Sequence, residues 1–183
     1  MKPLLRFDGV ALRRGGRLLF EDLDLSIGPG EALQVLGPNG SGKSSLIRLA
    51  AGLLQQERGY VGRSRLALAD DNIALDRELP LKRALGFWRG ETGPAMEALG
   101  IALLADIPVR LLSSGQLKRA TLARVASSDA QLWLLDEPLN ALDTEGARRL
   151  ATLIDQHRSR GGAVLTASHQ PLPGDWRQLE LGA

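Results

Sequence analysis

The chain has 183 residues, a formal net charge of +2 and a hydrophobic content of 44%, which is typical of one folded globular domain. The small charge argues against a nucleic-acid-binding surface, because such surfaces are densely basic, so we expect no nucleic-acid partner. There is no cysteine, which excludes disulfides and thiolate metal sites. No apolar stretch approaches the ~20 residues that cross a bilayer, and residues 1–6 lack the apolar core of a signal peptide.

The first 30 residues are predicted to form two strands, 4–12 and 18–27, joined by a turn. In the second strand, leucine and isoleucine residues alternate with charged or polar ones, which is the period of a half-buried strand. Glycines punctuate a further stretch of β-structure at residues 59–70. We therefore expect a small antiparallel β subdomain made of residues 1–30 and 59–70.

Short apolar runs alternate with helical patterns in the rest of the chain, which favours a mainly parallel sheet covered on both faces by helices. Residues 71–128 are helical in composition and predict a short inserted α-helical subdomain. The fold class is therefore α/β, a single domain over residues 1–183 with a core at 31–58 and 129–183. The predicted core elements are strands at 32–36, 132–136 and 163–168 and helices at 43–54 and 144–160.

Residues 37–44 fit the phosphate-loop pattern G-x-x-x-x-G-K-[ST], between a predicted strand and a predicted helix. Three glycines let the backbone curl so that its N–H groups point at a polyphosphate, and the next helix adds the positive end of its dipole. Lys43 can reach the β- and γ-phosphates, and the Ser44 hydroxyl can ligate Mg²⁺. We therefore predict a P-loop NTPase core. The predicted nucleotide-binding residues are Gly37, Pro38, Asn39, Gly40, Ser41, Gly42, Lys43, Ser44 and Ser45.

Asp136 ends an apolar run, and Glu137 follows it immediately. Successive residues at a strand end face different ways, so Asp136 can hold Mg²⁺ while Glu137 faces the γ-phosphate as the general base for a water molecule. Lys43, Asp136 and His169 all lie just past predicted strand ends. Ligands of parallel sheets bind at that edge, so we expect these side chains to converge there.

The segment Leu-Ser-Ser-Gly-Gln at residues 112–116 precedes another predicted helix. It combines a hydroxyl, free backbone N–H groups and the positive end of a helix dipole, which together form a second anion-binding device. One chain already has one phosphate cradle. A second cradle suggests that it serves the nucleotide of another subunit.

These segments resemble the motifs of ATP-binding cassette (ABC) ATPases, in the same order. They correspond to the Walker A loop (37–44), the signature (112–116), Walker B with its glutamate (132–137), the D-loop (140–143) and the switch histidine, His169. The resemblance implies the ABC ATPase fold and a head-to-tail dimer, with each ATP between one subunit's P-loop and the other's signature. It implies that Lys43, Glu137 and His169 are catalytic, and that His169 contacts the γ-phosphate and helps to position Glu137. The remaining ATP contacts that it implies are Ser113, Ser114, Gly115, Gln116 and Asp143.

Within this family, residues 30–46, 132–143 and 161–173 resemble the ATP-binding subunits of bacterial cytochrome c maturation exporters. That resemblance implies integral membrane subunits as partners and a role in haem delivery for cytochrome c assembly. It also implies a peripheral location on the cytoplasmic side of the bacterial inner membrane.

Three positions depart from the ABC pattern. Ser114 stands where the signature usually has glycine, and Arg14 stands where an aromatic residue usually stacks on adenine. A guanidinium can also stack on a base, so Arg14 is predicted to contact the nucleotide. No glutamine lies between Gln56 and Gln116 to contact Mg²⁺, and Asn72 is the nearest chemical substitute, so it is the third predicted metal residue.

Several alternatives remain open at the sequence level. The chain could serve a different small-substrate or lipid transporter, act as a soluble nucleotide-gated clamp, or sense nucleotide without turnover. A P-loop kinase of small molecules would leave residues 112–116 unexplained. Phe87 and Trp88 are expected to pack in the core of the helical subdomain, with a groove for a membrane subunit's helix as the alternative.

Overall fold

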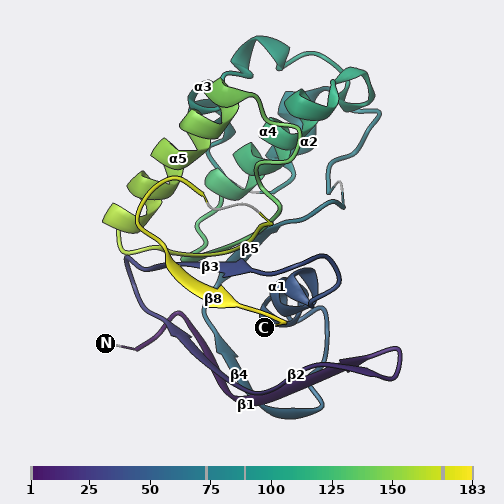
Figure 1. Ribbon diagram of the computed structural model, residues 1–183. Coiled ribbons are helices and arrows are strands. Elements are labelled where there is room, and N and C mark those ends of the chain that lie inside the picture. The colour runs from purple at the N-terminus through teal and green to yellow at the C-terminus, as the bar shows by residue number, and fades with distance from the viewer. Residues whose placement is uncertain (1, 73, 89, 170–171, 183) are drawn as a thin grey trace.

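The computed structural model describes residues 2–72, 74–88, 90–169 and 172–182. Figure 1 shows three layers: an antiparallel sheet at the bottom, a central sheet with α1 beside it, and a group of helices at the top. Within the described ranges, no helix is both long and apolar enough to pass through a bilayer.

The lower sheet contains β1 (Leu5–Arg14), β2 (Arg17–Ile27) and β4 (Arg58–Arg63), in the order β2-β1-β4. β1 is antiparallel to both neighbours, so the predicted hairpin is present. Its turn is made by Gly15 and Gly16, which both have positive φ angles, as a tight hairpin requires. Leu5, Phe7 and Ile27 are fully buried, and they belong to a cluster that packs this sheet's inner face against the central layer.

The central sheet has five strands in the order β5-β6-β7-β3-β8, and every neighbouring pair is parallel. All residues of β6 and β7 are buried, as expected of strands covered on both faces. The strands are β3 (Ala32–Leu36), β5 (Leu66–Ala69), β6 (Leu132–Asp136), β7 (Ala163–Ala167) and β8 (Arg177–Glu180).

β5 corrects one prediction. Residues 59–70 were expected to belong together to the β subdomain, but β4 pairs with β1 while β5 pairs with β6 of the central sheet. The physical reason lies in the side chains: Leu-Ala-Leu-Ala is apolar on both faces and fits a covered sheet, whereas β4 exposes its arginines at both ends.

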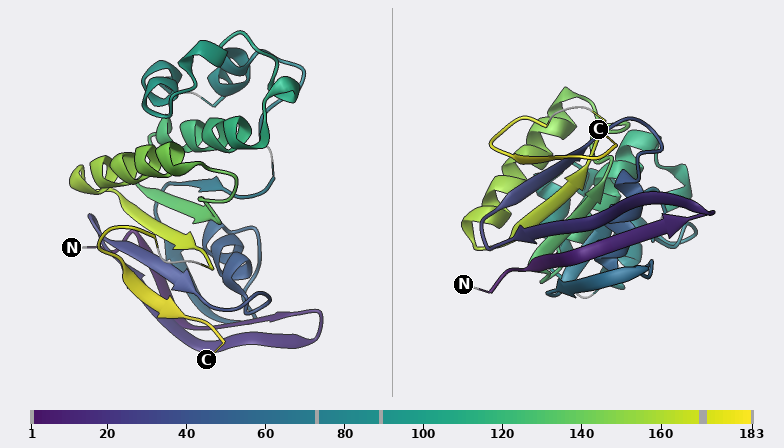
Figure 2. Two further views of the ribbon diagram at one scale, coloured as in Figure 1. Left: turned by 45° about the horizontal axis from the view of Figure 1, so that its top comes forward. Right: turned by 60° about the horizontal axis from the view of Figure 1, so that its bottom comes forward.

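Helices cover both faces of the central sheet (Figure 2). α1 (Lys43–Ala51) lies between it and the antiparallel sheet, and one buried cluster joins all three. α5 (Thr144–Ser159) lies on the other face. α1 ends earlier than the predicted residue 54, because Gly52 takes a left-handed conformation whose N–H caps the carbonyl groups of Arg48 and Leu49.

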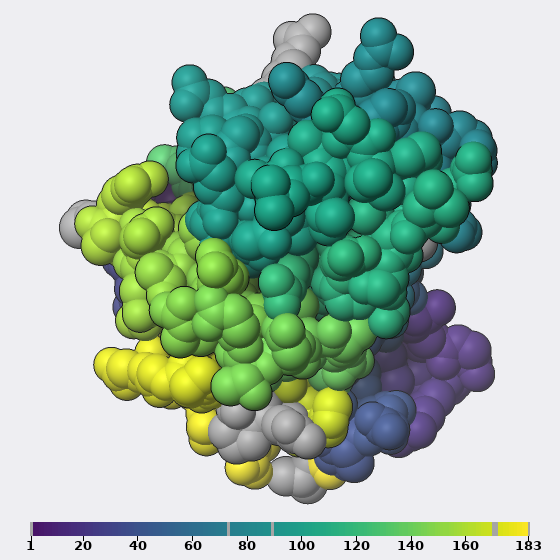
Figure 3. Space-filling model, turned by 90° about the horizontal axis from the view of Figure 1, so that it is seen from above, coloured from purple at the N-terminus to yellow at the C-terminus, as the bar shows by residue number. Residues whose placement is uncertain are grey.

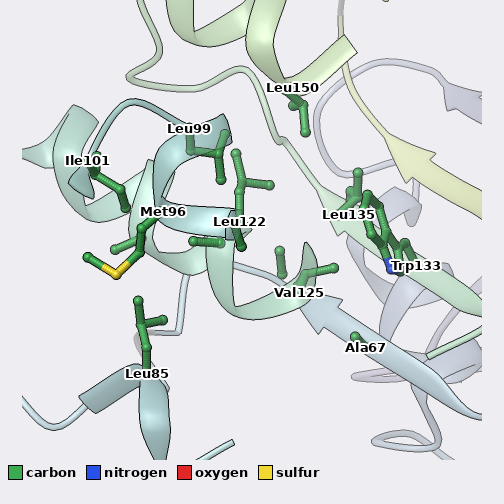
Figure 4. Close-up of a cluster of buried hydrophobic side chains, with 14 of the residues drawn as sticks. Ala67, Leu85, Met96, Leu99, Ile101, Leu122, Val125, Trp133, Leu135 and Leu150 are labelled. Atoms are coloured by element: carbon green, nitrogen blue, oxygen red, sulfur yellow. The ribbon is translucent and has the colours of Figure 1, made fainter. Parts of the chain in front are cut away.

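The helical subdomain contains α2 (Leu81–Gly86), α3 (Thr92–Ala98) and α4 (Ser114–Ala126), with 3₁₀ turns at Ala102–Leu104 and Val109–Leu111. In the view from above it lies beside α5 (Figure 3). A second buried cluster joins Leu85, Met96 and Leu122 of these helices to Trp133 and Leu135 of β6 (Figure 4). The α/β architecture predicted from the sequence is confirmed.

Phe87 and Trp88 do not follow the prediction that they pack in the core of the helical subdomain. The Phe87 side chain is 78% exposed, and its ring contacts the edge of the Trp88 ring, with 5.5 Å between centroids. Trp88 is partly covered because its indole N–H donates to the carbonyl of Ala74 and its ring lies under the Arg124 guanidinium. Both residues follow the short α2 helix, which ends before it can turn them inward.

Candidate active site

The loop between β3 and α1 curls through three glycines with positive φ angles: 149° at Gly37, 80° at Gly40 and 105° at Gly42. A Cβ atom on Gly37 would collide with the carbonyl oxygen of Leu181 and with Ser41 Oγ, so only glycine fits there. The loop ends at Lys43, the first residue of α1, so the free N–H groups of the helix face the inside of the curl.

Lys43 is buried, and its ammonium group donates hydrogen bonds to the carbonyl oxygens of Gly37 at 2.7 Å and Pro38 at 3.0 Å. Neither acceptor carries a formal charge. The positive charge of Lys43 is therefore held within the loop without being neutralised, and it is available to an anionic ligand.

Ser44 and Asp136 meet although they come from different elements. Ser44 Oγ donates to Asp136 Oδ1 at 3.0 Å. Asp136 is only 4% exposed, and burial raises the pKa of its carboxyl group, while the Ser44 hydrogen bond opposes that shift. Hydroxyl and carboxylate oxygens are the ligands that Mg²⁺ takes in phosphate sites, so this pair fits Mg²⁺.

Within the described ranges no group of three or more histidine, cysteine or acidic side chains could hold a metal ion by itself. Mg²⁺ in a nucleotide site usually has one or two protein ligands and takes the others from phosphates and water.

Glu137 and His169 form the second pair, with 3.0 Å between His169 Nδ1 and Glu137 Oε2. Asp136 and Ala167 are register partners at the ends of β6 and β7, so Glu137 directly after β6 and His169 two residues after β7 both lie at the same edge of the sheet. Glu137 has a positive φ of 45°, and its N–H donates to the Ala167 carbonyl at 2.8 Å. A non-glycine residue in that conformation is held by its surroundings, as is common at active sites.

Except for Asp136, which is buried behind Ser44, these groups line one cavity of about 930 Å³. The sequence predicted all of its lining residues except Leu19 and Asn140. Leu19 comes from the β1–β2 hairpin, and Asn140 belongs to the D-loop motif and could have been chosen from it. The cavity is lined by Arg14, Leu19, Gly37, Pro38, Asn39, Gly40, Gly42, Lys43, Ser44, Ser45, Glu137, Asn140 and His169.

Arg14 lies on the edge of this cavity, at the end of β1. Its guanidinium donates to Ser45 Oγ at 3.3 Å. Arg14 thus lies beside the P-loop helix, and its contact with the nucleotide stays a prediction.

The predicted signature residues begin α4. Ser113 is the N-cap, with Ser113 Oγ accepting from the Gln116 N–H at 3.3 Å and Gln116 Oε1 accepting from the Ser113 N–H at 2.9 Å. Ser113, Gly115 and Gln116 line a separate cavity of about 310 Å³ with Asp143. Within one chain, the signature and the P-loop therefore open into different cavities.

Asp143 caps α5 by accepting the Gly146 N–H at 2.8 Å, and it also accepts a hydrogen bond from Arg119 of α4. These two hydrogen bonds lower the pKa of the Asp143 carboxyl group. The D-loop and the signature helix are thus joined by an ion pair at the second cavity.

Asn72 is hydrogen-bonded to Asp70. Its backbone N–H and its side-chain amide both donate to Asp70, at 3.1 and 2.8 Å. The side-chain amide is therefore engaged by a neighbouring carboxylate, and a contact between Asn72 and Mg²⁺ stays a prediction.

Comparisons with known proteins agree with this geometry. Residues 20–140 match the family model described as ABC transporter. The chain is 54% identical to the cytochrome c biogenesis ATP-binding export protein CcmA of Sphingopyxis alaskensis, over 100% of this chain and 98% of that protein. It is 52% identical to the protein of the same name from Novosphingobium aromaticivorans, over 89% of this chain and 87% of that one.

Solved structures show the same fold. The ATP-binding subunit of an ABC transporter superposes with a TM-score of 0.83 at 20% identity, covering 91% of this chain and 79% of that one. A Pyrococcus furiosus protein described as an ABC transporter ATP-binding protein has a TM-score of 0.84 at 19% identity, covering 97% and 96%. The ABC ATPase fold expected from the motifs is confirmed.

Proposed function

The chain belongs to the ABC transporter family, as an ATP-binding and ATP-hydrolysing subunit of the CcmA type, and we propose that Lys43, Glu137 and His169 carry its chemistry. The observation that supports this assignment is the 3.0 Å contact between Glu137 and His169 on the wall of the P-loop cavity. A carboxylate held by an imidazole beside a phosphate cradle is the arrangement that a hydrolytic water needs.

In the proposed reaction, Glu137 accepts a proton from water as the water oxygen attacks the γ-phosphorus of ATP in line with the leaving ADP oxygen. The bond from that oxygen to the γ-phosphorus breaks, and phosphate and ADP leave. His169 donates to Glu137 and so fixes the direction of the carboxylate. Lys43 and the P-loop N–H groups offset the negative charge on the phosphate oxygens.

We assign Mg²⁺ to Ser44 and Asp136, with Asn72 as a further predicted contact. When bound, Mg²⁺ would neutralise charge on the phosphate oxygens. The chain presents a hydroxyl and a carboxylate together at the start of α1.

The separate signature cavity supports a head-to-tail dimer. The N-terminus of α4, at Ser114 and Gly115, would meet the triphosphate in the partner subunit's P-loop, since its N–H groups and helix dipole favour an anion. Ser113, Gln116 and Asp143 would form the rest of that contact. Closure of the dimer on ATP and reopening after hydrolysis would transmit work to the membrane subunits.

We propose that those integral membrane subunits belong to the exporter that supplies haem for cytochrome c assembly, and that the chain binds them on the cytoplasmic side of the inner membrane. The names of its relatives, which are cytochrome c biogenesis export proteins, support this cargo class. A different small-substrate or lipid transporter is the alternative, and no nucleic-acid partner is expected.

The test is to purify the chain with the membrane proteins that accompany it, and to measure ATP hydrolysis for the wild type, Glu137→Gln and the matched control Glu97→Gln. Glu97 is an exposed glutamate of α3. Loss of the general base should lower kcat by about 10²–10⁴-fold while ATP binding is retained. A Glu137→Gln variant as active as the control would reject the mechanism, and a lipid permease as the only partner would reject the haem assignment.

A further inference from the structure

Lys118 is a cation near the catalytic carboxylates that the mechanism above does not use. It lies on α4, one turn after Ser114, and is half-buried. Its ammonium group donates to the backbone carbonyl of Asp136 at 3.4 Å. This hydrogen bond is long, and it joins α4 to the end of β6.

The ammonium group of Lys118 interacts electrostatically with four carboxylates. Burial lowers the pKa of Lys118, and the negative charges of Asp71, Asp136, Glu137 and Asp70 oppose that shift. Asp136 and Asp70 are themselves buried, so their charges are poorly screened by water. Lys118 therefore offsets repulsion among acids that the site needs close together.

The same helix is joined to the segment after Asp136 at two further points. Arg119 donates to Asp143. The Gly115 backbone lies so close to the D-loop that a Cβ atom there would be 2.8 Å from the Ala141 carbonyl oxygen. α4 and residues 136–143 thus form one packed unit, with the signature at one end and Asp136 and Glu137 at the other.

We propose that Lys118 is a positioning residue for hydrolysis, which holds the Asp136–Glu137 segment against α4 and balances its charge. This inference rests on the proposed function, because it assigns Mg²⁺ to Asp136 and the base to Glu137. The contact of Lys118 is with a backbone carbonyl, so it acts through these two residues and not on the substrate.

Removing the charge of Lys118 is expected to slow hydrolysis and, at the same time, to tighten Mg²⁺ binding. Lys118→Met should lower kcat about tenfold, because the carboxylate of Glu137 loses its placement, while KM for ATP stays within about twofold. The same change should lower the Mg²⁺ concentration for half-saturation about two- to fivefold, because a cation is removed from the neighbourhood of the metal's carboxylate. Damage to packing alone would not tighten Mg²⁺ binding.

Two assays on the full chain with its membrane partner test this. One measures ATP hydrolysis, and the other titrates Mg²⁺ against a fluorescent ATP analogue in a Glu137→Gln background, which requires no turnover. Lys118→Arg keeps the charge and should retain kcat within about twofold. Lys82→Met removes an exposed lysine from α2 as the matched control and should behave as the parent does.

The proposal is overturned if Lys118→Met keeps the parent kcat, if its Mg²⁺ half-saturation is unchanged or raised, or if Lys118→Arg is equally impaired. If Lys118→Met fails to fold, Lys118→Gln, which also removes the charge, takes its place in both assays with the same two expected results. Failure of the proposed function has a different signature, because the wild type and Glu137→Gln would then hydrolyse ATP equally or not at all.

Discussion

Ser44 Oγ donates a 3.0 Å hydrogen bond to Asp136 Oδ1, joining the start of α1 to the end of β6 across 92 positions of sequence. β6 is not a sheet neighbour of β3, the strand before the P-loop, because β7 lies between them. The contact therefore depends on how α1 packs across the sheet. It brings a hydroxyl and a carboxylate oxygen together, and these are the two groups that would hold Mg²⁺.

Asp136→Asn should stabilise the nucleotide-free protein at pH 7.5. Burial raises the folded-state pKa of Asp136, so its ionisation at neutral pH costs folding free energy, whereas asparagine can still accept the Ser44 hydrogen bond uncharged. We expect a rise in Tm of a few degrees, roughly what 1 kcal/mol gives in a domain of this size. Thermal unfolding measures it, with the exposed Asp106→Asn as the matched control.

The sign of the pH dependence follows. The wild type is free of this penalty below the unfolded pKa of about 4 and acquires it as the pH rises through the higher folded pKa. The difference between Asp136→Asn and wild type should therefore shrink as the pH is lowered toward about 4. A variant that melts below the wild type at pH 7.5 would contradict the argument.

Gly115→Ala should weaken the ATP-driven dimer without weakening ATP binding to the P-loop of the same chain. The new Cβ atom would lie 2.8 Å from the Ala141 carbonyl oxygen, so the D-loop or the N-terminus of α4 must shift. Gly93→Ala is the matched control, because Gly93 is also helical and has nothing within 4 Å of a built Cβ.

Size-exclusion chromatography of both glycine variants in a Glu137→Gln background, with ATP and Mg²⁺, measures the dimer. A fluorescent ATP analogue measures binding to the monomer. If Gly115→Ala dimerises as well as Gly93→Ala does, the signature is not part of the composite site.

Local patterns in the sequence were sufficient for most of the central sheet and for the P-loop. The P-loop motif includes Gly37, at a position where only glycine fits. β6 and β7 are continuous apolar runs, which is the pattern of buried strands. The features that could not be predicted depend on contacts between residues far apart in the sequence. β5 pairs with β6 across more than sixty residues, and Leu19 reaches the cavity only because the hairpin folds over Gly42. No local pattern encodes either contact, and the same is true of Lys118 beside Asp136.

Arg14→Ala should raise KM for ATP and leave kcat nearly unchanged. The Arg14 guanidinium is held beside the cavity by Ser45, where it can stack on a nucleobase, and it is not one of the residues proposed to carry the chemistry. Loss of such a stack costs about 0.5–2 kcal/mol, which corresponds to a KM roughly two- to thirtyfold higher.

Arg14→Trp should restore the low KM. The control is Arg17→Ala, because Arg17 is an exposed arginine at the start of β2. Steady-state kinetics with ATP decides, and equal KM values for Arg14→Ala and Arg17→Ala would remove Arg14 from the site.

His157→Phe should remove a loss of stability that the wild type shows as the pH falls. The His157 ring is stacked on Trp133, with 4.0 Å between centroids and 10° between planes, and its Nε2 atom is buried without a hydrogen-bond partner. Burial lowers the pKa of His157, and the charge of Arg160 adds to this shift, while backbone hydrogen bonds at Gln131 and Ala163 oppose it.

A depressed folded-state pKa fixes the sign. Above the unfolded pKa of about 6.5 both states hold a neutral imidazole, and below it the unfolded state takes up a proton that the folded state resists. The free energy of unfolding should therefore decrease between about pH 7 and pH 5 in the wild type, and decrease less in His157→Phe, whose ring keeps the stack but cannot titrate. Urea unfolding at pH 8, 7, 6 and 5 measures the free energy of unfolding of both proteins. The value at pH 8 is the reference, because the His157 ring is then neutral in the folded and in the unfolded state. Parallel curves for the two proteins would show that His157 contributes nothing to the pH dependence.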